Sequence, residues 1–428
     1  MKSNARPAKT PGKIYVIGAG LAGLSAAVTL ASRGAAVEVI EAATQAGGRC
    51  RSYLDPVHGM TIDNGNHLVL SGNKATFTYL RAIGAANRLV GPAEAVFAFH
   101  DVRHRRAWTI RPNAGLLAWW VFSRARRVPG SSSGDYLALV ALLTSRGDRR
   151  VEDVIACKGP LWDRLIEPFL LAALNTEPKG ASARLAGAVI AQSLARGGRA
   201  YRPRIAEPSL SAAFIDPALT FLGARGIPVQ LGRRLRAVTL ESDRVASLRL
   251  GDGEQRLGGN DTVILATPPW IAADLIPGLV VPDRFNPIVN AHFRTAPPPD
   301  AAAMVGVIGG TAQWIFAFPD RLSVTISAAD DFVDMDREVL ARLIWRDIAT
   351  VHGLGPDLPA WQIVKERRAT FAATPDQNAR RPPAATAWRN LFLAGDWTQT
   401  GLPSTIEGAV RSGNTAAGLA FKATRGAW

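Results

Sequence analysis

The sequence predicts an α/β fold built around a parallel sheet, and two observations indicate this. Near the N-terminus, the apolar run Ile14–Ile17 is followed by a glycine-rich turn, an Ala/Leu-rich helix to about Arg33, and a second apolar run, Val37–Ile40. Near the C-terminus, a buried run at 390–394 leads through Gly395 into another helix. Apolar runs that alternate with helices are typical of parallel sheets covered on both faces.

Composition places the chain among globular proteins and favours an anionic partner. Of 428 residues, 47% are hydrophobic and 20% are charged, which excludes a disordered or fibrous chain. The formal charge is +15, and such an excess attracts anionic surfaces. Two cysteines cannot form a disulfide framework or a four-thiolate metal site, and the six scattered histidines lack metal-binding spacing. No metal is therefore predicted, and a reducing, cytoplasmic setting is expected.

A membrane-spanning segment is not predicted. Residues 1–12 are polar, lack the apolar stretch of a secretion signal, and are expected to form a loose tail. The apolar stretch Ala301–Pro319 has the length of a membrane helix. However, glycines at 309 and 310 divide it into two β-rich runs, which predicts a hairpin.

The N-terminal glycines carry the pattern of a dinucleotide site. In the segment 18–23, Gly18 would permit the tight turn, Gly20 would let the backbone approach a pyrophosphate, and Gly23 would let helix and strand pack closely. Glu41 ends the second strand, where an acid accepts ribose hydroxyls and disfavours a 2′-phosphate. An ordinary glycine-rich turn is the alternative, and the strand–turn–helix–strand context favours FAD or NAD.

Two later motifs favour FAD over NAD. Small residues at 47–48 let the chain pass close to a diphosphate, and Arg49 can pair with its charge, although a solvated arginine in a surface turn is the alternative. Asp396 follows the late strand and offers a carboxylate to a ribityl chain. A second GxGxxG between a strand and a helix is lacking, so a separate electron donor is expected.

These residues resemble the FAD-dependent amine oxidase and phytoene desaturase superfamily. The order of its motifs is kept: GxGxxG, GGR, DTVILATPP at 261–269 and LAGDW at 393–397. Three further segments resemble the squalene-associated branch, the hydroxysqualene dehydroxylases of hopanoid synthesis: DNGNH at 63–67, ALNTEP at 173–178 and GDWTQTGLPSTIEGAVRSG at 395–413. Asn66 departs from the glutamine expected in many relatives, which leaves the local contacts of this segment open.

The resemblance implies a Rossmann-type FAD-binding domain and a flavoenzyme that reduces hydroxysqualene to squalene with loss of water. The flavin is expected to be non-covalent, because no cysteine lies near 395–410, where covalently flavinylated relatives attach it. Val238 would contact the adenine through its backbone. The other residues implied to contact FAD are Gly18, Gly20, Ala22, Glu41, Gly48, Arg49, Asp396, Thr405 and Ile406.

Loss of water from an allylic alcohol calls for an acid, and the segment DNGNH supplies two candidates that should fold near the flavin. His67 is one candidate proton donor, and its replacement by Ala is expected to reduce turnover without removing flavin. Asp63 is the other, although it can instead only orient the loop. Asn64 and Asn66 can equally be turn residues.

Three rival functions remain open at this stage. A desaturase of the same superfamily would oxidise a carotenoid precursor and have nearly the same FAD motifs. An amine oxidase is less favoured because of the squalene-branch segments. A prenyl-binding carrier without redox function is disfavoured by the intact Glu41, Arg49 and Asp396.

The domain organisation is expected to be discontinuous. The FAD-binding domain would comprise 1–72, 205–268 and 385–428, and an α+β substrate domain would comprise 73–204 and 269–384. Within the latter, Leu161–Leu174 is helix-like, and Pro168 predicts a kink.

A basic, aromatic segment lies in the predicted substrate domain. Seven arginines and no acidic residue lie between Asp101 and Asp135, namely Arg103, Arg105, Arg106, Arg111, Arg124, Arg126 and Arg127. Trp108, Trp119, Trp120 and Phe122 are interleaved with them. This pattern favours an anionic membrane surface, with the protein peripheral on the inner face of the membrane. A solvated loop with core tryptophans is one alternative; nucleic acid is not expected, since no known binding module is present.

Overall fold

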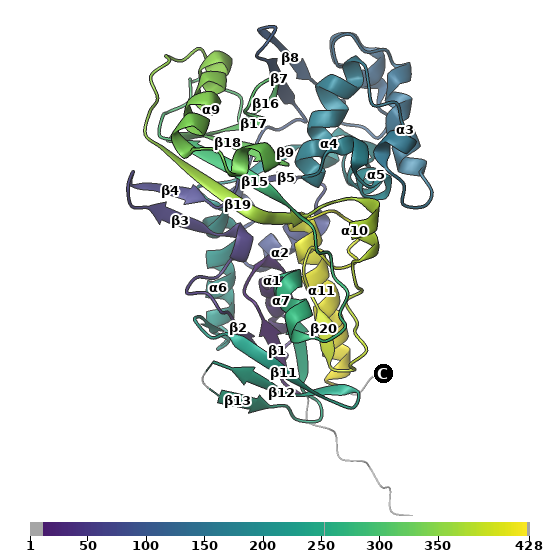
Figure 1. Cartoon of the computed structure of the whole chain (residues 1–428), viewed down its shortest axis with the longest axis vertical. Helices are drawn as coiled ribbons and strands as arrows, with labels where there is room; N and C mark the ends of the chain where they lie inside the picture. Colours follow the sequence, from purple (N-terminus) through teal and green to yellow (C-terminus); the bar gives the residue numbers. More distant parts are fainter. Residues whose placement is uncertain (1–11, 252, 426–428) are drawn as a thin grey trace, which may run out of the picture.

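A computed structural model describes residues 12–251 and 253–425, and its lower half is built on a five-stranded parallel sheet (Figure 1). The strand order is β10–β2–β1–β14–β20, so β14 pairs with both the first and the last strand of the chain. The strands are β1 (Ile14–Ile17), β2 (Val37–Ile40), β10 (Val229–Gln230), β14 (Thr262–Leu265) and β20 (Leu391–Leu393). The strands expected from the two ends of the sequence are confirmed.

Helices cover this sheet, as parallel sheets require. Helix α1 (Leu21–Ala31) packs along α11 (Ile406–Ala423), and α6 (Asp216–Gly223) also contacts α1. The two long helices approach closely because their contact consists of small residues. A Cβ added to Gly413 would lie 2.2 Å from the carbonyl oxygen of Ala22. This contact places the middle of α11 beside the first turn of α1.

A small antiparallel sheet is inserted between β10 and β14. Its strands are β11 (Leu235–Glu241), β12 (Arg244–Leu250) and β13 (Gly253–Arg256). It lies at the bottom of the molecule in Figure 1, at the end of the parallel sheet. The segment 205–268, predicted to belong to the FAD-binding domain, therefore contains this sheet as well as β14.

The upper half contains a seven-stranded sheet in the order β19–β15–β18–β17–β16–β7–β8. Its strands are β7 (Phe97–Asp101), β8 (Arg106–Ile110), β15 (Phe285–Phe293), β16 (Met304–Ile308), β17 (Trp314–Phe318), β18 (Arg321–Ser327) and β19 (Trp361–Phe371). The hairpin predicted within Ala301–Pro319 is present as β16 and β17. Helix α9 (Arg337–His352) packs on this sheet through a separate apolar cluster.

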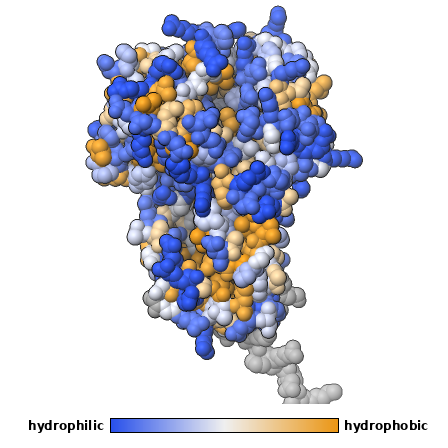
Figure 2. Space-filling view, viewed as in Figure 1, coloured by the Kyte–Doolittle hydropathy of each residue, from blue (hydrophilic) through white to orange (hydrophobic). Residues whose placement is uncertain are grey.

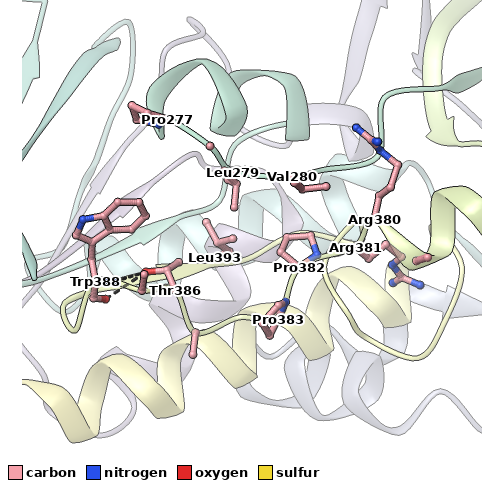
Figure 3. A pocket seen from close by; sticks show the side chains of 14 residues that line it. Pro277, Leu279, Val280, Arg380, Arg381, Pro382, Pro383, Thr386, Trp388 and Leu393 are labelled. Atoms are coloured by element: carbon pink, nitrogen blue, oxygen red, sulfur yellow. Dashed lines mark hydrogen bonds between the residues drawn. The ribbon is translucent and has the colours of Figure 1, made fainter.

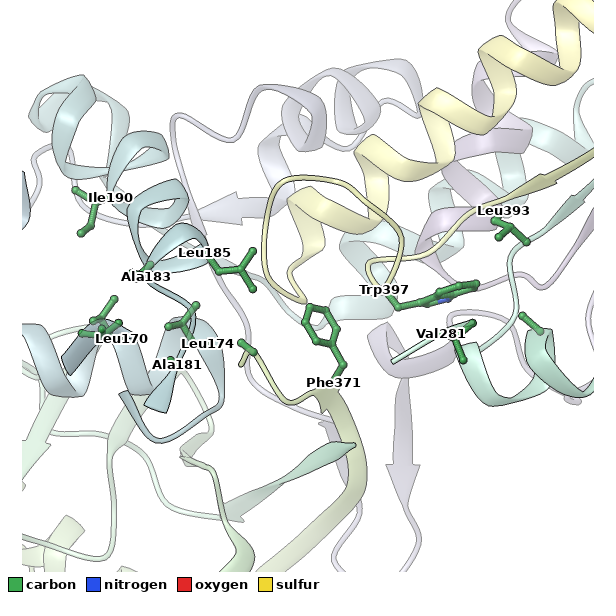
Figure 4. Packing of buried hydrophobic residues seen from close by; sticks show 14 of the residues in the cluster. Leu170, Leu174, Ala181, Ala183, Leu185, Ile190, Val281, Phe371, Leu393 and Trp397 are labelled. Atoms are coloured by element: carbon green, nitrogen blue, oxygen red, sulfur yellow. The ribbon is translucent and has the colours of Figure 1, made fainter. Parts of the chain in front are cut away.

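A group of helices completes the upper half: α3 (Leu137–Thr144), α4 (Glu167–Leu174) and α5 (Ala183–Gln192). A π-helical turn at Trp162–Ile166 precedes α4, and Pro168 lies in the first turn of α4, so the predicted helical segment is present and the kink stays a prediction. Figure 4 shows the packing of buried side chains of α4 and α5, together with Phe371 and Trp397. One apolar cluster therefore extends from these helices to the end of β20.

The remaining short elements lie within the two halves or between them. They are β3 (Ser52–Asp55), β4 (Met60–Asp63), β5 (Leu68–Leu70), α2 (Lys74–Ala82), β6 (Leu89–Val90), β9 (Pro203–Ala206), α7 (Pro269–Leu275), α8 (Asp330–Val333) and α10 (Pro375–Ala379). Strand β9 pairs with both β5 and β6. The expected domain boundary at 205 divides β9, and the two-domain division stays a prediction.

No helix within residues 12–251 and 253–425 has the length and apolar character needed to cross a bilayer. The tail expected at 1–12 lies outside the described residues except for Gly12.

Candidate active site

The three glycines of the first turn occupy different environments, and each environment matches a predicted role. Gly18 has φ +107°, a conformation that favours glycine. A Cβ on Gly23 would lie 1.9 Å from the carbonyl oxygen of Gly18, so only glycine lets α1 pack against this turn. A Cβ on Gly20 would meet no described atom within 4 Å. The open side of the turn at the start of α1 can therefore accept a phosphate group.

Glu41 is held at the end of β2, beside the glycine turn. Its Oε2 accepts a hydrogen bond of 2.7 Å from the backbone N–H of Ala19, and its Oε1 accepts one of 2.8 Å from Ala43. Its backbone exchanges hydrogen bonds of 2.9 Å with Gln230 and Arg233. The carboxylate is thus fixed where the adenosine half of a dinucleotide would extend from the turn.

Arg49 pairs with the second predicted acid, although the two lie at opposite ends of the sequence. Its Nη2 lies 2.6 Å from Oδ1 of Asp396, and its Nη1 donates to the carbonyl oxygen of Ala369. The Asp396 side chain is 7% exposed, whereas that of Arg49 is 45% exposed. The guanidinium therefore bonds to a buried carboxylate and a backbone carbonyl, and its exposed part can meet an anionic ligand. This pairing favours a structured position over a freely solvated arginine in a surface turn.

Four other predicted FAD contacts lie in three places. Gly48 lies against the glycine turn, since a Cβ on it would be 3.4 Å from Cα of Gly20. Thr405 caps α11 by accepting a hydrogen bond from Gly408, and Ile406 is the first residue of that helix. Val238 is half-buried in β11, where it pairs with Leu248. The backbone that bonds directly to Glu41 precedes Val238 in the chain, so its adenine contact stays a prediction.

Asp63 faces the protein interior. Its Oδ1 accepts hydrogen bonds from Oγ of Ser52 (2.5 Å) and from the backbone of Leu210 (2.9 Å). Its carbonyl oxygen accepts a 3.1 Å bond from Nε2 of His292. Burial raises the pKa of Asp63, opposed by the bonds from Ser52 and Leu210. These contacts favour the second interpretation made from the sequence, in which Asp63 orients the loop.

The loop that follows is fastened to the upper sheet by Asn290 of β15. Its amide donates to the carbonyl oxygen of Asn64 (3.3 Å), and its Oδ1 accepts from the backbone of Asn66 (3.3 Å). Asn66 also donates to Oγ1 of Thr325 (3.2 Å). The two asparagines of DNGNH therefore join the loop to the upper sheet.

His67 follows this loop and is half-buried. Desolvation, reinforced by the positive charge of Arg49 and opposed by Asp396, lowers the pKa of His67 to about 4. Its imidazole is therefore neutral at pH 7 and is a poor source of a cationic acid. This environment favours a hydrogen-bonding role for His67 over proton donation.

Sequence reasoning did not single out Glu366, which lies beside the DNGNH loop. It is half-buried on β19, and Nδ2 of Asn64 lies 3.4 Å from its Oε2. The same strand contacts Arg49 three residues later, at Ala369. Glu366 sits in the run KERR, which reads as an exposed charged strand, so no sequence signal distinguished it.

Buried His292 makes the fold sensitive to acid. Its Nε2 donates to the carbonyl oxygen of Asp63, and in the neutral ring Nδ1 accepts from the hydroxyl of Ser323. Desolvation, then the charge of Arg321, lowers its pKa to about 3. Because the unfolded ring titrates near pH 6.5, stability present above this pH is lost as pH falls toward 3.

The measurement is urea unfolding at pH 7 and pH 5 for wild type and His292→Gln. Between pH 7 and pH 5, the free energy of unfolding of the wild type should fall by about 2 kcal/mol more than that of the variant. Equal losses of unfolding free energy in the two proteins would contradict the assignment of this acid sensitivity to His292.

A separate surface cavity of about 410 Å³ lies beside β20 (Figure 3). Its lining includes Leu279, Val280, Arg380, Trp388 and Leu393. The residues predicted to contact FAD are not part of this lining, so this cavity is distinct from the glycine turn and the Arg49–Asp396 pair.

Comparison with known proteins agrees with this geometry. A family model described as flavin containing amine oxidoreductase matches residues 21–420. Hydroxysqualene dehydroxylases of Rhodopseudomonas palustris and Sinorhizobium fredii are 55% and 51% identical to this chain, covering 96% and 97% of it and 99% of each relative. The solved cyclohexylamine oxidase of Brevibacterium oxydans has a TM-score of 0.66 at 14% identity, covering 96% of this chain and 99% of its own.

The chain is therefore an FAD-dependent oxidoreductase of the flavin containing amine oxidoreductase superfamily. Within that superfamily it belongs to the hydroxysqualene dehydroxylase family. The fold and family predicted from the sequence are confirmed. The roles of the individual site residues stay predictions.

Proposed function

We propose that this protein reduces hydroxysqualene to squalene, with release of the hydroxyl group as water. The observation that carries the proposal is the combination of full-length family membership with an intact FAD cradle. That cradle consists of the open turn at Gly20, the fixed carboxylate of Glu41 and the Arg49–Asp396 pair. A redox-inactive carrier would not need to retain all three features.

The cradle suits FAD because its parts match the cofactor's chemistry. The start of α1 and Arg49 would hold the pyrophosphate, Glu41 the adenosine ribose, and Asp396 the ribityl chain. Bound reduced FAD supplies a hydride equivalent to the substrate. The start of α11, capped by Thr405, would lie beside the flavin ring, as the family resemblance implies.

The protein's own task is to remove the hydroxyl and protect the carbon it leaves. Protonation of the hydroxyl breaks the C–O bond, releases water and leaves an allylic cation, which hydride addition converts to the hydrocarbon. Buried apolar side chains such as Phe371 and Trp397 exclude water, which would otherwise recapture the cation. As the proton donor we propose Glu366 in its protonated, carboxylic acid form, because it is half-buried beside Asn64 of the DNGNH loop, whereas Asp63 faces the interior.

The proposal includes two partners. A separate reductant would supply electrons, because the sequence lacks a second dinucleotide motif between a strand and a helix. The protein would associate peripherally with the cytoplasmic face of the membrane through the region of Arg103–Arg127, where its water-insoluble substrate resides.

A single turnover tests the function. Protein reduced under anaerobic conditions is mixed with hydroxysqualene, and the flavin absorbance and the extracted lipid are followed together. One squalene formed for each flavin reoxidised is expected. Persistent reduced flavin with unchanged substrate would contradict the proposal.

A carotenoid-type desaturase is the second candidate, because its FAD motifs would be nearly the same. Electron flow separates the two functions. A desaturase would transfer electrons to oxidised flavin from a polyprenyl precursor that has fewer double bonds than the product, whereas the proposed enzyme should leave oxidised flavin unchanged with that compound.

A further inference from the structure

Six large apolar side chains are exposed on one part of the helical region. They come from the segment 114–122 and from α3, and we call them the apolar patch. Leu116, Leu117, Trp119 and Phe122 are 75%, 83%, 52% and 74% exposed, and Leu137 and Val140 are 68% and 50% exposed. Figure 2 shows apolar surface over the part of the molecule where α3 lies. Single exposed apolar residues are common, but a group of this kind indicates a contact surface.

The two segments of the apolar patch are joined beneath the surface. The ring of buried Trp120 packs edge-on against that of buried Tyr136, with centroids 5.3 Å apart. Each of these inward rings is the sequence neighbour of an outward apolar side chain, Trp119 in one case and Leu137 in the other. The patch is therefore one surface built by two elements.

The exposed loop is held by specific hydrogen bonds. The buried side chain of Asn113 donates to the carbonyl oxygen of Leu117 (2.8 Å) and accepts from the backbone of Trp120 (3.3 Å). This bonding fixes a loop whose tip consists of leucine and tryptophan. The leucines and tryptophan are thus presented outward by a defined structure.

Positive charge flanks the apolar patch. The guanidinium of Arg126 lies 4.8 Å from the ring centroid of Trp119, and Arg127 donates to the carbonyl oxygen of Val121. Arg111 and Arg124 are exposed. Since residues 102–134 contain no acid, this charge is not neutralised within its own segment. Tryptophan and arginine beside exposed leucines match the interfacial region of an anionic bilayer.

We propose that the apolar patch inserts into the acyl region of an anionic membrane, with the surrounding arginines at the lipid phosphates. A second copy of this chain is a poorer partner, because joining two such faces would bring their arginines together. The proposal locates the membrane contact in two elements and gives its apolar and basic parts separate functions. Its relevance to catalysis rests on the proposed function, but binding itself can be measured without substrate.

The experiment compares binding of flavin-loaded full-length protein to two kinds of vesicle. One contains phosphatidylcholine alone, and the other contains equal parts of phosphatidylcholine and phosphatidylglycerol. The test variant is Leu117→Ser/Phe122→Ser. The matched control is Leu54→Ser/Val57→Ser, since these side chains are 63% and 75% exposed on another part of the molecule. Flavin content and turnover of detergent-solubilised hydroxysqualene are measured for every variant.

Wild type and the control should bind the anionic vesicles, and the test variant should bind at least about tenfold more weakly because buried apolar area is lost. Wild-type tryptophan fluorescence should shift to the blue on binding. Turnover in detergent should be unchanged, which separates failure of this proposal from failure of the proposed function. Equal binding by the test variant, or a concentration-dependent dimer abolished by the same substitutions, would overturn the membrane assignment.

Discussion

Replacing Gly23 with alanine should yield protein without bound flavin and with greatly reduced stability. The added Cβ would lie 1.9 Å from the carbonyl oxygen of Gly18 and 3.2 Å from Cβ of Ala266. The Gly18 carbonyl belongs to the backbone and cannot rotate away as a flexible side chain can, so α1 must move away from the turn. We expect a loss of about 3 kcal/mol or more. Urea unfolding and the flavin-to-protein absorbance ratio measure the two effects.

The matched variant is Gly20→Ala. The Gly20 φ of −72° suits any L-residue, and its Cβ would meet no described atom within 4 Å. The unfolding free energy should therefore remain within about 0.5 kcal/mol of wild type, as at an unrestricted surface position. FAD affinity should nevertheless fall at least tenfold by our estimate, because the methyl group occupies the space assigned to the pyrophosphate. If this variant bound FAD with wild-type affinity, the proposal that the pyrophosphate binds at this turn would be wrong.

The parallel sheet was predictable because its signal is local. Both faces of β1, β14 and β20 are covered, so each strand reads as an uninterrupted apolar run, and the glycines that follow β1 and β20 mark the turns. The hairpin of β16 and β17 was predictable for the same reason. The boundary at 205 was harder to predict, because strand β9 forms through pairing with β5 and β6, which are distant in the sequence.

The candidate site was predictable only where a motif specifies it. The glycines, Glu41 and Arg49 belong to local patterns, whereas the contact between Arg49 and Asp396 spans the chain. The role of Asp63 depends on Leu210 and His292, which no spacing rule relates to it. The basic part of the proposed membrane surface, the arginines between residues 103 and 127, was visible in the sequence. The contribution of α3 depends on the packing of Trp120 against Tyr136.

Replacing Glu366 with glutamine should lower kcat about 100-fold while flavin binding and stability stay near wild type, since general acid catalysis typically contributes 10²–10⁴-fold. Glutamine keeps the size of the side chain and can still accept from Asn64, but it cannot release the proton needed by the departing hydroxyl. KM should change little, because the lost interaction acts mainly as the C–O bond breaks. Single-turnover flavin reoxidation measures the effect directly.

A second substrate distinguishes proton donation by Glu366 from a structural contribution. In an acetate ester of the same allylic alcohol, the leaving group is acetate, which departs as a carboxylate and has much less need of a proton than a hydroxyl group. Turnover of this ester by Glu366→Gln should therefore approach the wild-type rate, whereas a distorted site would turn over both substrates slowly. His67→Gln provides the comparison, since a neutral hydrogen-bonding His67 should affect both substrates similarly. If Glu366→Gln processed the alcohol normally, or failed equally with the ester, the proton donor would have to be sought elsewhere.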